Sequence, residues 1–159
     1  MRIKINNSNR LSKIIEKTTG VKIFSPITGI TTDSRECKAG DLYIAIVGDR
    51  SDGHKYINDV DSINASAALV HKKNADGKLN LQQILVDDTK KTLGEIARKW
   101  RNHFDVPIIA ITGSNGKTST KDLLYHLLKY KFNVHSTKGN YNTSIGVPLS
   151  LLELKKSHS

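Results

Sequence analysis

The feature that most constrains the fold is a short glycine-containing loop between an apolar run and a helical pattern. Residues 107–112 read PIIAIT, which is typical of a parallel strand covered on both faces. After the loop, residues 118–130 have the periodicity of a helix, and residues 133–137, NVHST, favour a second strand. This order predicts a right-handed βαβ unit in an α/β protein. The inner side of its helix is predicted to carry Leu123, Leu124, Leu127 and Leu128.

The loop itself has the composition of a phosphate-binding loop. A loop between a strand and a helix directs backbone N–H groups and the positive end of the helix dipole at one point. Lys117 is expected to reach the β- and γ-phosphates of a nucleotide, and the Thr118 hydroxyl to bind Mg²⁺. The longer form of this motif needs glycine at position 111, where the chain has Ile111, so a simple turn is the alternative. The predicted ATP-binding residues are Gly113, Ser114, Asn115, Gly116, Lys117, Thr118 and Ser119.

Short strands and helices alternate in the first hundred residues. The helix at 9–20 is predicted to begin at Asn9 and end at Gly20, and the helix at 89–103 to be capped by Asp88. Pro107 disfavours helical geometry at Val106, which places a domain boundary near 104–106. We therefore expect one domain at 1–104 and a second at 105–159. The other predicted elements are strands at 27–33, 42–47, 67–71 and 83–87, a short helix at 55–63 and a turn at 74–78.

Charge and composition exclude several classes of protein. The 25 Lys and Arg against 15 Asp and Glu give a net charge of +10, but the basic residues are scattered, and aromatic residues make up only 6%. This favours a lysine-rich surface, or a field that gathers phosphorylated ligands, over a nucleic-acid stacking surface. No apolar run approaches the roughly 18 residues of a membrane helix. Cys37 is the only cysteine, which excludes an intrachain disulfide and favours the cytoplasm.

Four segments, taken in order, resemble the Mur ligases. TGSNGKTS resembles the nucleotide loop of these enzymes and of their folylpolyglutamate synthetase relatives. TTDSRECKAGDLYIAIVGDRSDGHKYI (31–57) looks like the signature of their first domain, and VDDTKKTLGEIARKWR (86–101) is similar to the helix that closes it. GNYNTSIGVPLSLLEL (139–154) resembles the branch that adds D-alanyl-D-alanine, although Thr143 stands where that branch usually has a second asparagine.

The resemblance implies a small N-terminal α/β substrate domain followed by the start of a P-loop-type ATP-binding central domain. It implies an ATP- and Mg²⁺-dependent ligase that joins D-alanyl-D-alanine to a UDP-N-acetylmuramoyl-tripeptide through an acyl phosphate, with Lys117 as the catalytic cation. The family has further domains, so the chain is expected to be an N-terminal fragment that is inactive alone and part of a monomeric cytoplasmic enzyme. Neither nucleic acid nor membrane insertion is expected.

Candidate substrate-binding residues lie in three places. Asp33, Ser34 and Arg35 follow a predicted strand, and the resemblance assigns them to the UDP end of the substrate; a solvent-exposed Asp-Ser turn is the alternative. His54 follows a turn at Asp52-Gly53 and is a weaker candidate for the same end. The resemblance places Asn140, Asn142 and Thr143 near the reacting carboxylate.

Three other functions remain open from the sequence. A ligase that adds the third amino acid usually has a Thr-Thr-Pro ending near residue 145, which is absent here. A non-catalytic module that binds a UDP-sugar or a nucleotide would bind these ligands without turnover. A nucleic-acid-binding module would show salt-dependent binding to random oligonucleotides.

Overall fold

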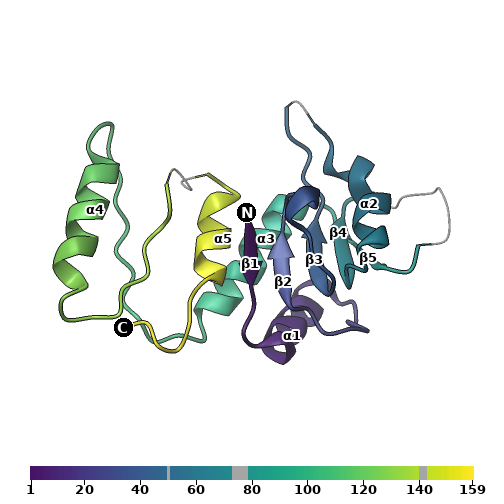
Figure 1. Ribbon diagram of the computed structural model, residues 1–159, viewed down its shortest axis with the longest axis horizontal. Helices are drawn as coiled ribbons and strands as arrows, with labels where there is room; N and C mark the ends of the chain where they lie inside the picture. Colours follow the sequence, from purple (N-terminus) through teal and green to yellow (C-terminus); the bar gives the residue numbers. More distant parts are fainter. Residues whose placement is uncertain (50, 73–78, 140–142) are drawn as a thin grey trace. The chain divides into compact units, whose positions relative to one another are not determined.

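The computed structural model describes residues 1–49, 51–72, 79–139 and 143–159 (Figure 1). The chain separates into two compact units, residues 1–96 and 97–159. The α/β class predicted from the sequence is confirmed by the sheet and helices of the first unit. Among the described residues, no helix combines the length and the apolar character that crossing a membrane requires.

The first unit is built on a five-stranded sheet. The strands lie in the order β1 (Arg2–Lys4), β2 (Gly29–Thr31), β3 (Asp41–Ile44), β4 (Ala67–Val70) and β5 (Gln82–Leu85). β1 is antiparallel to β2, and each later strand is parallel to its neighbour. The helical elements of this unit are α1 (Ser8–Thr19), η1 (Ser34–Glu36), η2 (Gly53–Tyr56) and α2 (Ile57–Ser62), while α3 (Thr89–Arg101) begins in it.

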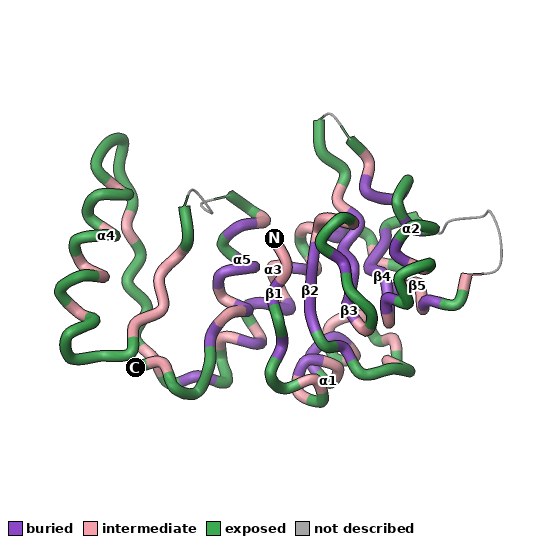
Figure 2. The backbone as a smooth tube through the Cα atoms, in the orientation of Figure 1, coloured by how far each residue is buried: buried purple, intermediate pink, exposed green. Residues whose placement is uncertain are grey.

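Buried apolar side chains pack on both faces of this sheet, as is usual for parallel strands. On β3, Tyr43 belongs to a buried cluster that includes Ile57 and Val60 of α2. Its neighbours Leu42 and Ile44 alternate to the other face and are also fully buried. Strand β3 as a whole is buried (Figure 2). The strand predicted at 67–71 is confirmed as β4, whereas the strand predicted at 42–47 is shorter than expected, because β3 ends at Ile44.

The helix caps were partly predicted. Gly20 ends α1 in the left-handed conformation, and the Asp88 side chain accepts hydrogen bonds from the backbone N–H groups of Lys90 and Lys91, as expected. The predicted N-cap Asn9 is wrong, because Asn9 lies inside the first turn of α1. The cap is Asn7, whose side-chain oxygen accepts from the backbone N–H of Arg10 at 3.0 Å.

Strand β1 was missed from the sequence, because three residues give too little periodicity to read. It is joined to β3 across β2 by Arg2, whose guanidinium donates to Asp41 at 2.6 and 2.7 Å. Gly29 of β2 lies between them: a Cβ there would be 2.5 Å from Asp41 Oδ1 and 2.8 Å from Arg2 Nη2. Gly29 is therefore what allows this ion pair to cross β2.

The second unit contains α4 (Lys117–Leu128) and α5 (Gly146–Leu152). The strands predicted at 107–112 and 133–137 are not formed among its described residues. Both segments instead line a cavity of about 300 Å³, together with Leu124 and Leu128 of α4. A strand needs a hydrogen-bonding neighbour, and no such pairing is formed by either segment among the described residues.

The predicted inner face of α4 is half wrong. Leu124 and Leu128 line the cavity, but Leu123 and Leu127 are 62% and 59% exposed. The four leucines form two adjacent pairs that are one helical turn apart. Such pairs lie on the same broad side of a helix, which is why the sequence predicts one apolar face. The unit covers only the half of that side that faces the cavity.

Candidate functional site

The glycine-containing loop joins the extended segment at 107–112 to α4, as predicted. Gly113 has φ of +144° and Gly116 has φ of +76°, and Gly116 is the N-cap of α4. Both values lie in a region that side chains rarely adopt, so the two glycines are what permits this turn. Among the described residues, no side-chain hydrogen bond caps the N-terminus of the helix. Within this part of the chain, the first backbone N–H groups of α4 therefore meet no side-chain acceptor at the point where the helix dipole is positive.

The side chain of Lys117 bonds back to the backbone of its own loop. Its ammonium group donates to the backbone oxygen of Gly113 and, at 3.2 Å, to that of Ser114. The side chain thus holds its positive charge beside the uncapped helix end. Ser114, Asn115, Thr118 and Ser119 are exposed around it. A phosphate arriving here meets N–H groups, an ammonium and hydroxyl groups, so the residues fit an anionic ligand.

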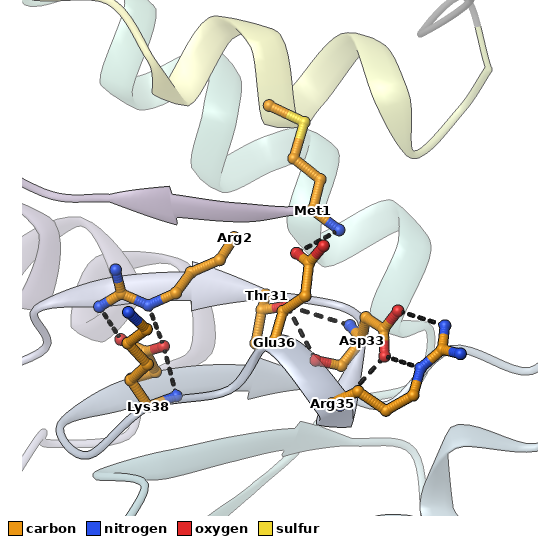
Figure 3. A network of polar contacts seen from close by, with 8 residues as sticks. Met1, Arg2, Thr31, Asp33, Arg35, Glu36 and Lys38 are labelled. Carbon is orange, nitrogen blue, oxygen red and sulfur yellow. Dashed lines mark hydrogen bonds and ion pairs between the residues drawn. The ribbon is translucent and has the colours of Figure 1, made fainter.

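Asp33 and Arg35 form a local ion pair at the end of β2 (Figure 3). Asp33 caps η1 by accepting from the backbone N–H of Arg35, and its carboxylate accepts two further hydrogen bonds from the Arg35 guanidinium at 2.9 and 2.7 Å. These bonds lower the pKa of Asp33 to about 2. The Arg35 side chain is 87% exposed, so its guanidinium is accessible to a solvent-borne anion. Ser34 is the first residue of η1.

His54 occupies a different environment from the one that its turn-rich sequence suggested. The ring is buried, with Nδ1 2.6 Å from Asp52 Oδ1 and Nε2 accepting from the backbone N–H of His71 at 3.2 Å. Both ring nitrogens are used within the fold. Contact with a substrate through a ring nitrogen would require one of these bonds to be exchanged.

Two neighbours of this site were missed from the sequence, namely His71 and Lys72. Lys72 Nζ lies 2.7 Å from Asp52 Oδ2. Both residues follow β4, and a polar pair directly after a buried parallel strand was the signal that could have identified them. Parallel strands that are neighbours in the sheet bring the segments after them to one edge.

The hydroxyl of Tyr43 contacts the segment that carries His54. Tyr43 of β3 donates to the backbone oxygen of Gly53 at 3.0 Å. Burial raises the pKa of Tyr43, and the charges of Asp33 and Asp52 raise it further. The carboxylates of Asp33, after β2, and Asp52, before η2, thus both act electrostatically on the same buried phenol.

The remaining candidates lie in the second unit or outside the described residues. Thr143 Oγ1 accepts from the backbone N–H of Gly146 at 3.0 Å and so stabilises the start of α5. Asn140 and Asn142 fall outside the described residues. Within the part of the chain that is described, no three His, Cys, Asp or Glu side chains cluster as a metal site would require.

Both units of the chain match domains of known proteins. A model of the "Mur ligase family, catalytic domain" matches residues 26–101, and a model of the "Mur ligase middle domain" matches residues 111–159. UDP-N-acetylmuramoyl-tripeptide–D-alanyl-D-alanine ligase of Synechocystis is 42% identical over 83% of this chain. The same-named ligase of Escherichia coli is 36% identical over 80% of it. The chain spans 29% and 28% of the lengths of these two relatives.

Solved structures agree with the sequence relatives. A ligase structure from Acinetobacter baumannii, named for UDP-N-acetylmuramoylalanyl-D-glutamyl-2,6-diaminopimelate and D-alanyl-D-alanine, aligns with 92% of this chain. Its TM-score is 0.84 and its identity 32%, and the match covers 34% of that chain. The MurF ligase of Thermotoga maritima, solved in complex with ADP, aligns with 81% of this chain at a TM-score of 0.74 and 36% identity. The match covers 30% of that chain.

Proposed function

Because the chain belongs to the Mur ligase family, we propose that it is the N-terminal part of an ATP-dependent ligase that adds D-alanyl-D-alanine to a UDP-N-acetylmuramoyl-tripeptide. The single observation that carries this proposal is the identity of 36–42% to ligases of that name across both units.

We assign the nucleotide to the loop from Gly113 to Ser119. The uncapped end of α4 and the ammonium of Lys117 are its two sources of positive potential. On arrival of a nucleotide, Lys117 exchanges the oxygens of Gly113 and Ser114 for β- and γ-phosphate oxygens. There it offsets the charge that builds up during phosphoryl transfer. The structure of the Thermotoga maritima relative in complex with ADP supports an adenine nucleotide as the kind of ligand.

We assign the UDP end of the second substrate to residues 1–104 and the reacting end to residues 105–159. Arg35 is the proposed contact of the diphosphate, since its exposed guanidinium offers paired donors to phosphate oxygens. Ser34 adds a hydroxyl donor beside it. Asn140, Asn142 and Thr143 remain candidates for the reacting end by family resemblance alone.

The proposed reaction forms an amide from a carboxylate and an amine. A carboxylate oxygen of the tripeptide attacks the γ-phosphorus of ATP, ADP leaves, and an acyl phosphate results. The amine of D-alanyl-D-alanine then attacks the carbonyl carbon, loses a proton, and expels inorganic phosphate. Activation is needed because the unmodified carboxylate would have to expel an oxide ion.

We propose that the Thr118 hydroxyl is a ligand of Mg²⁺. Its hydroxyl is exposed in the first turn of α4, beside Lys117, and an oxygen ligand of this kind suits a hard cation that keeps most of its water. When bound, the cation would neutralise phosphate charge. We further propose that the intact enzyme is cytoplasmic, since ATP and UDP-sugars are cytoplasmic compounds, and, by family resemblance alone, that it is monomeric.

Calorimetric titration of the 159-residue chain tests the proposal. We expect it to bind ATP–Mg²⁺ and UDP-N-acetylmuramoyl-tripeptide at separate sites, and to release no phosphate when D-alanyl-D-alanine is added. Absence of binding for both ligands would overturn the proposal. A full-length form that binds both ligands without releasing phosphate would favour a non-catalytic binding module. Tight binding of random oligonucleotides at physiological salt would favour a nucleic-acid-binding function.

A further inference from the structure

Two extended segments of the second unit have backbone groups without protein partners. Residues 107–112 and 133–137 have strand-forming sequences, and both line the cavity of about 300 Å³. Within the described part of the chain, residues 108–112 and 134–136 form no backbone–backbone hydrogen bond. Backbone N–H and C=O groups in folded proteins pair with another group or with water. Two unused hydrogen-bonding edges therefore border this cavity.

The helices that border the cavity are also incompletely packed. Helix α4, which is described in full, buries none of its 12 residues, although Leu124 and Leu128 line the cavity (Figure 2). A helix of a folded unit normally covers its apolar stripe. From α5, Ser150 and Leu151 line the same cavity. Apolar side chains of two helices and two backbone edges thus meet in one place, as they do around a central parallel strand.

A buried hydroxyl group on the wall of the cavity has no partner among the described residues. Ser150 is 6% exposed, and its Oγ forms no hydrogen bond within this part of the chain. Its backbone oxygen, by contrast, lies 3.0 Å from His135 Nε2. Buried side-chain hydroxyl groups normally have a hydrogen-bond partner. An occupant of the cavity that carries polar backbone groups would supply one.

One of the two edges is already paired at its first residue. The backbone N–H of Ser159 donates to the oxygen of Asn133 at 3.2 Å, and Ser159 Oγ accepts from the N–H of Asn133 at 3.0 Å. The Asn133 side chain donates to the oxygen of Ser157 at 2.8 Å. Ser159 also lines the cavity. The contact shows that an extended chain can reach this edge and form hydrogen bonds with it.

We infer that the cavity is the slot for a further β-strand, which pairs with residues 107–112 along one edge and with residues 133–137 along the other. Its occupant is an extended apolar segment of the proposed ligase outside these 159 residues. This source rests on the proposed function, because the chain spans 29% and 28% of the lengths of two related ligases. A segment of six residues is about 20 Å long when extended, so each edge can pair with a strand of ordinary length.

Amide hydrogen exchange with a strand-forming peptide tests the slot in the 159-residue chain itself. The probe is the peptide Ac-IIAITKK-NH2, which copies residues 108–112 and ends in two lysines for solubility. At about 1 mM peptide we expect the amides of 108–112 and 134–136 to exchange roughly fivefold more slowly, and those of β3 to be unchanged. Protection of neither segment, or of only one, would overturn insertion between the two edges.

An N-methylated peptide separates strand pairing from the filling of an apolar cavity. Successive N–H groups of a strand point to opposite edges, so methylation of alternate amides keeps the side chains and blocks one edge. We expect this analogue to give no protection of the two segments. Equal protection by both peptides would show that the cavity accepts apolar side chains without strand pairing, and the slot would be rejected.

Two aspartate substitutions on α4 test the wall of the slot. Leu124→Asp places a carboxylate in the cavity, whereas Leu123→Asp places one at the neighbouring position, which is 62% exposed. We expect the peptide to protect the two segments in Leu123→Asp but not in Leu124→Asp, with equal helix content by circular dichroism. Equal protection in both variants would contradict the slot. If Leu124→Asp does not fold, the comparison of the two peptides decides.

The same measurement on the intact ligase tests the source of the strand. There we expect both segments to exchange at least roughly tenfold more slowly than in the 159-residue chain without peptide. Unchanged exchange would overturn this source, and protection that rises with the concentration of the 159-residue chain alone would assign the slot to a second copy instead. No nucleotide or UDP-sugar enters these experiments. A negative result therefore leaves the proposed function standing, and a failure to bind those ligands leaves the slot standing.

Discussion

Arg2 and Asp41 form a two-bond ion pair across the middle of three adjacent strands. The guanidinium donates to both carboxylate oxygens at 2.6 and 2.7 Å, and the Asp41 side chain is fully buried while that of Arg2 is 19% exposed. Asp41 also accepts from the backbone N–H of Lys38 at 2.9 Å. The pair therefore ties the antiparallel edge strand to the parallel part of the sheet and secures the turn before β3 (Figure 3).

We expect Arg2→Met to destabilise the first unit by about 3 kcal/mol, because it leaves a buried carboxylate without its cation. Arg35→Met is the matched control. It removes an ion pair of the same two-bond geometry, but at a side chain that is 87% exposed and screened by solvent, so it should cost far less than Arg2→Met. Urea unfolding followed by circular dichroism measures both values. Equal costs would show that burial does not distinguish the two pairs.

Gly29→Ala should also destabilise this unit. The added methyl group would approach Asp41 Oδ1 to 2.5 Å, and neither partner of the buried pair can retreat without losing its hydrogen bonds. Gly94→Ala provides the contrast, since no atom lies within 4 Å of its added Cβ and it is inside α3. There alanine should stabilise by up to about 1 kcal/mol. The two changes should thus move the urea midpoint in opposite directions, and a shift in the same direction would contradict this account.

The sequence predicted the elements whose signal is local. Runs apolar on both faces identified β3 and β4, and the side chain of Asp88 identified the start of α3. It missed β1, whose stability comes from Arg2 reaching a residue 39 positions away. The strands predicted at 107–112 and 133–137 have the right composition, but composition does not supply a hydrogen-bonding neighbour.

In the candidate site, too, the features with a local sequence signal could be predicted and those with distant partners could not. The order strand-like segment, glycines, lysine and helix was sufficient to locate the loop at 113–119, because its geometry depends on adjacent residues. The environment of His54 could not be read, since its partner His71 is 17 residues away and acts through its backbone. Every residue except proline has a backbone N–H, so the residue type at position 71 does not indicate this hydrogen bond.

Acid should weaken the first unit partly through Asp33. Its pKa is about 2 in the folded chain, below the value near 3.9 of an unfolded aspartate, so its contribution is complete above pH 4 and is lost as the pH falls toward 2. Asp33→Asn should therefore be less stable than the wild type at pH 6, with the difference shrinking at pH 2.5. Urea midpoints at the two pH values give this comparison. A constant difference would show that ionisation of Asp33 does not contribute to stability.

Lys117→Ala should reduce affinity for ATP–Mg²⁺ at least tenfold. A charged hydrogen bond to phosphate contributes about 1.5–3 kcal/mol, which corresponds to that factor or more. Lys156→Ala, at an exposed lysine outside the loop, controls for the loss of one positive charge from a basic chain. Calorimetry at fixed ionic strength compares the two variants. Equal affinities would remove Lys117 from the nucleotide site.

Amide hydrogen exchange should distinguish the extended segments of the second unit from the sheet of the first. The segments at 107–112 and 133–137 form no ladder among the described residues, and Ile108 and Ile109 are 50% and 60% exposed. Strands β3 and β4, by contrast, are paired on both sides and fully buried. Amides that lack a structural hydrogen bond exchange through small local openings, whereas those of a central strand need the sheet to open. We therefore expect backbone amides in 107–112 and 133–137 to exchange at least tenfold faster than those of Leu42–Ile44 and Ala68–Val70.

The amides at 124–128 inside α4 serve as an internal reference, because they belong to the same unit but have helical partners. Protection in the extended segments equal to that of β3 would mean that they pair in solution, and that the sheet of this unit forms within these 159 residues.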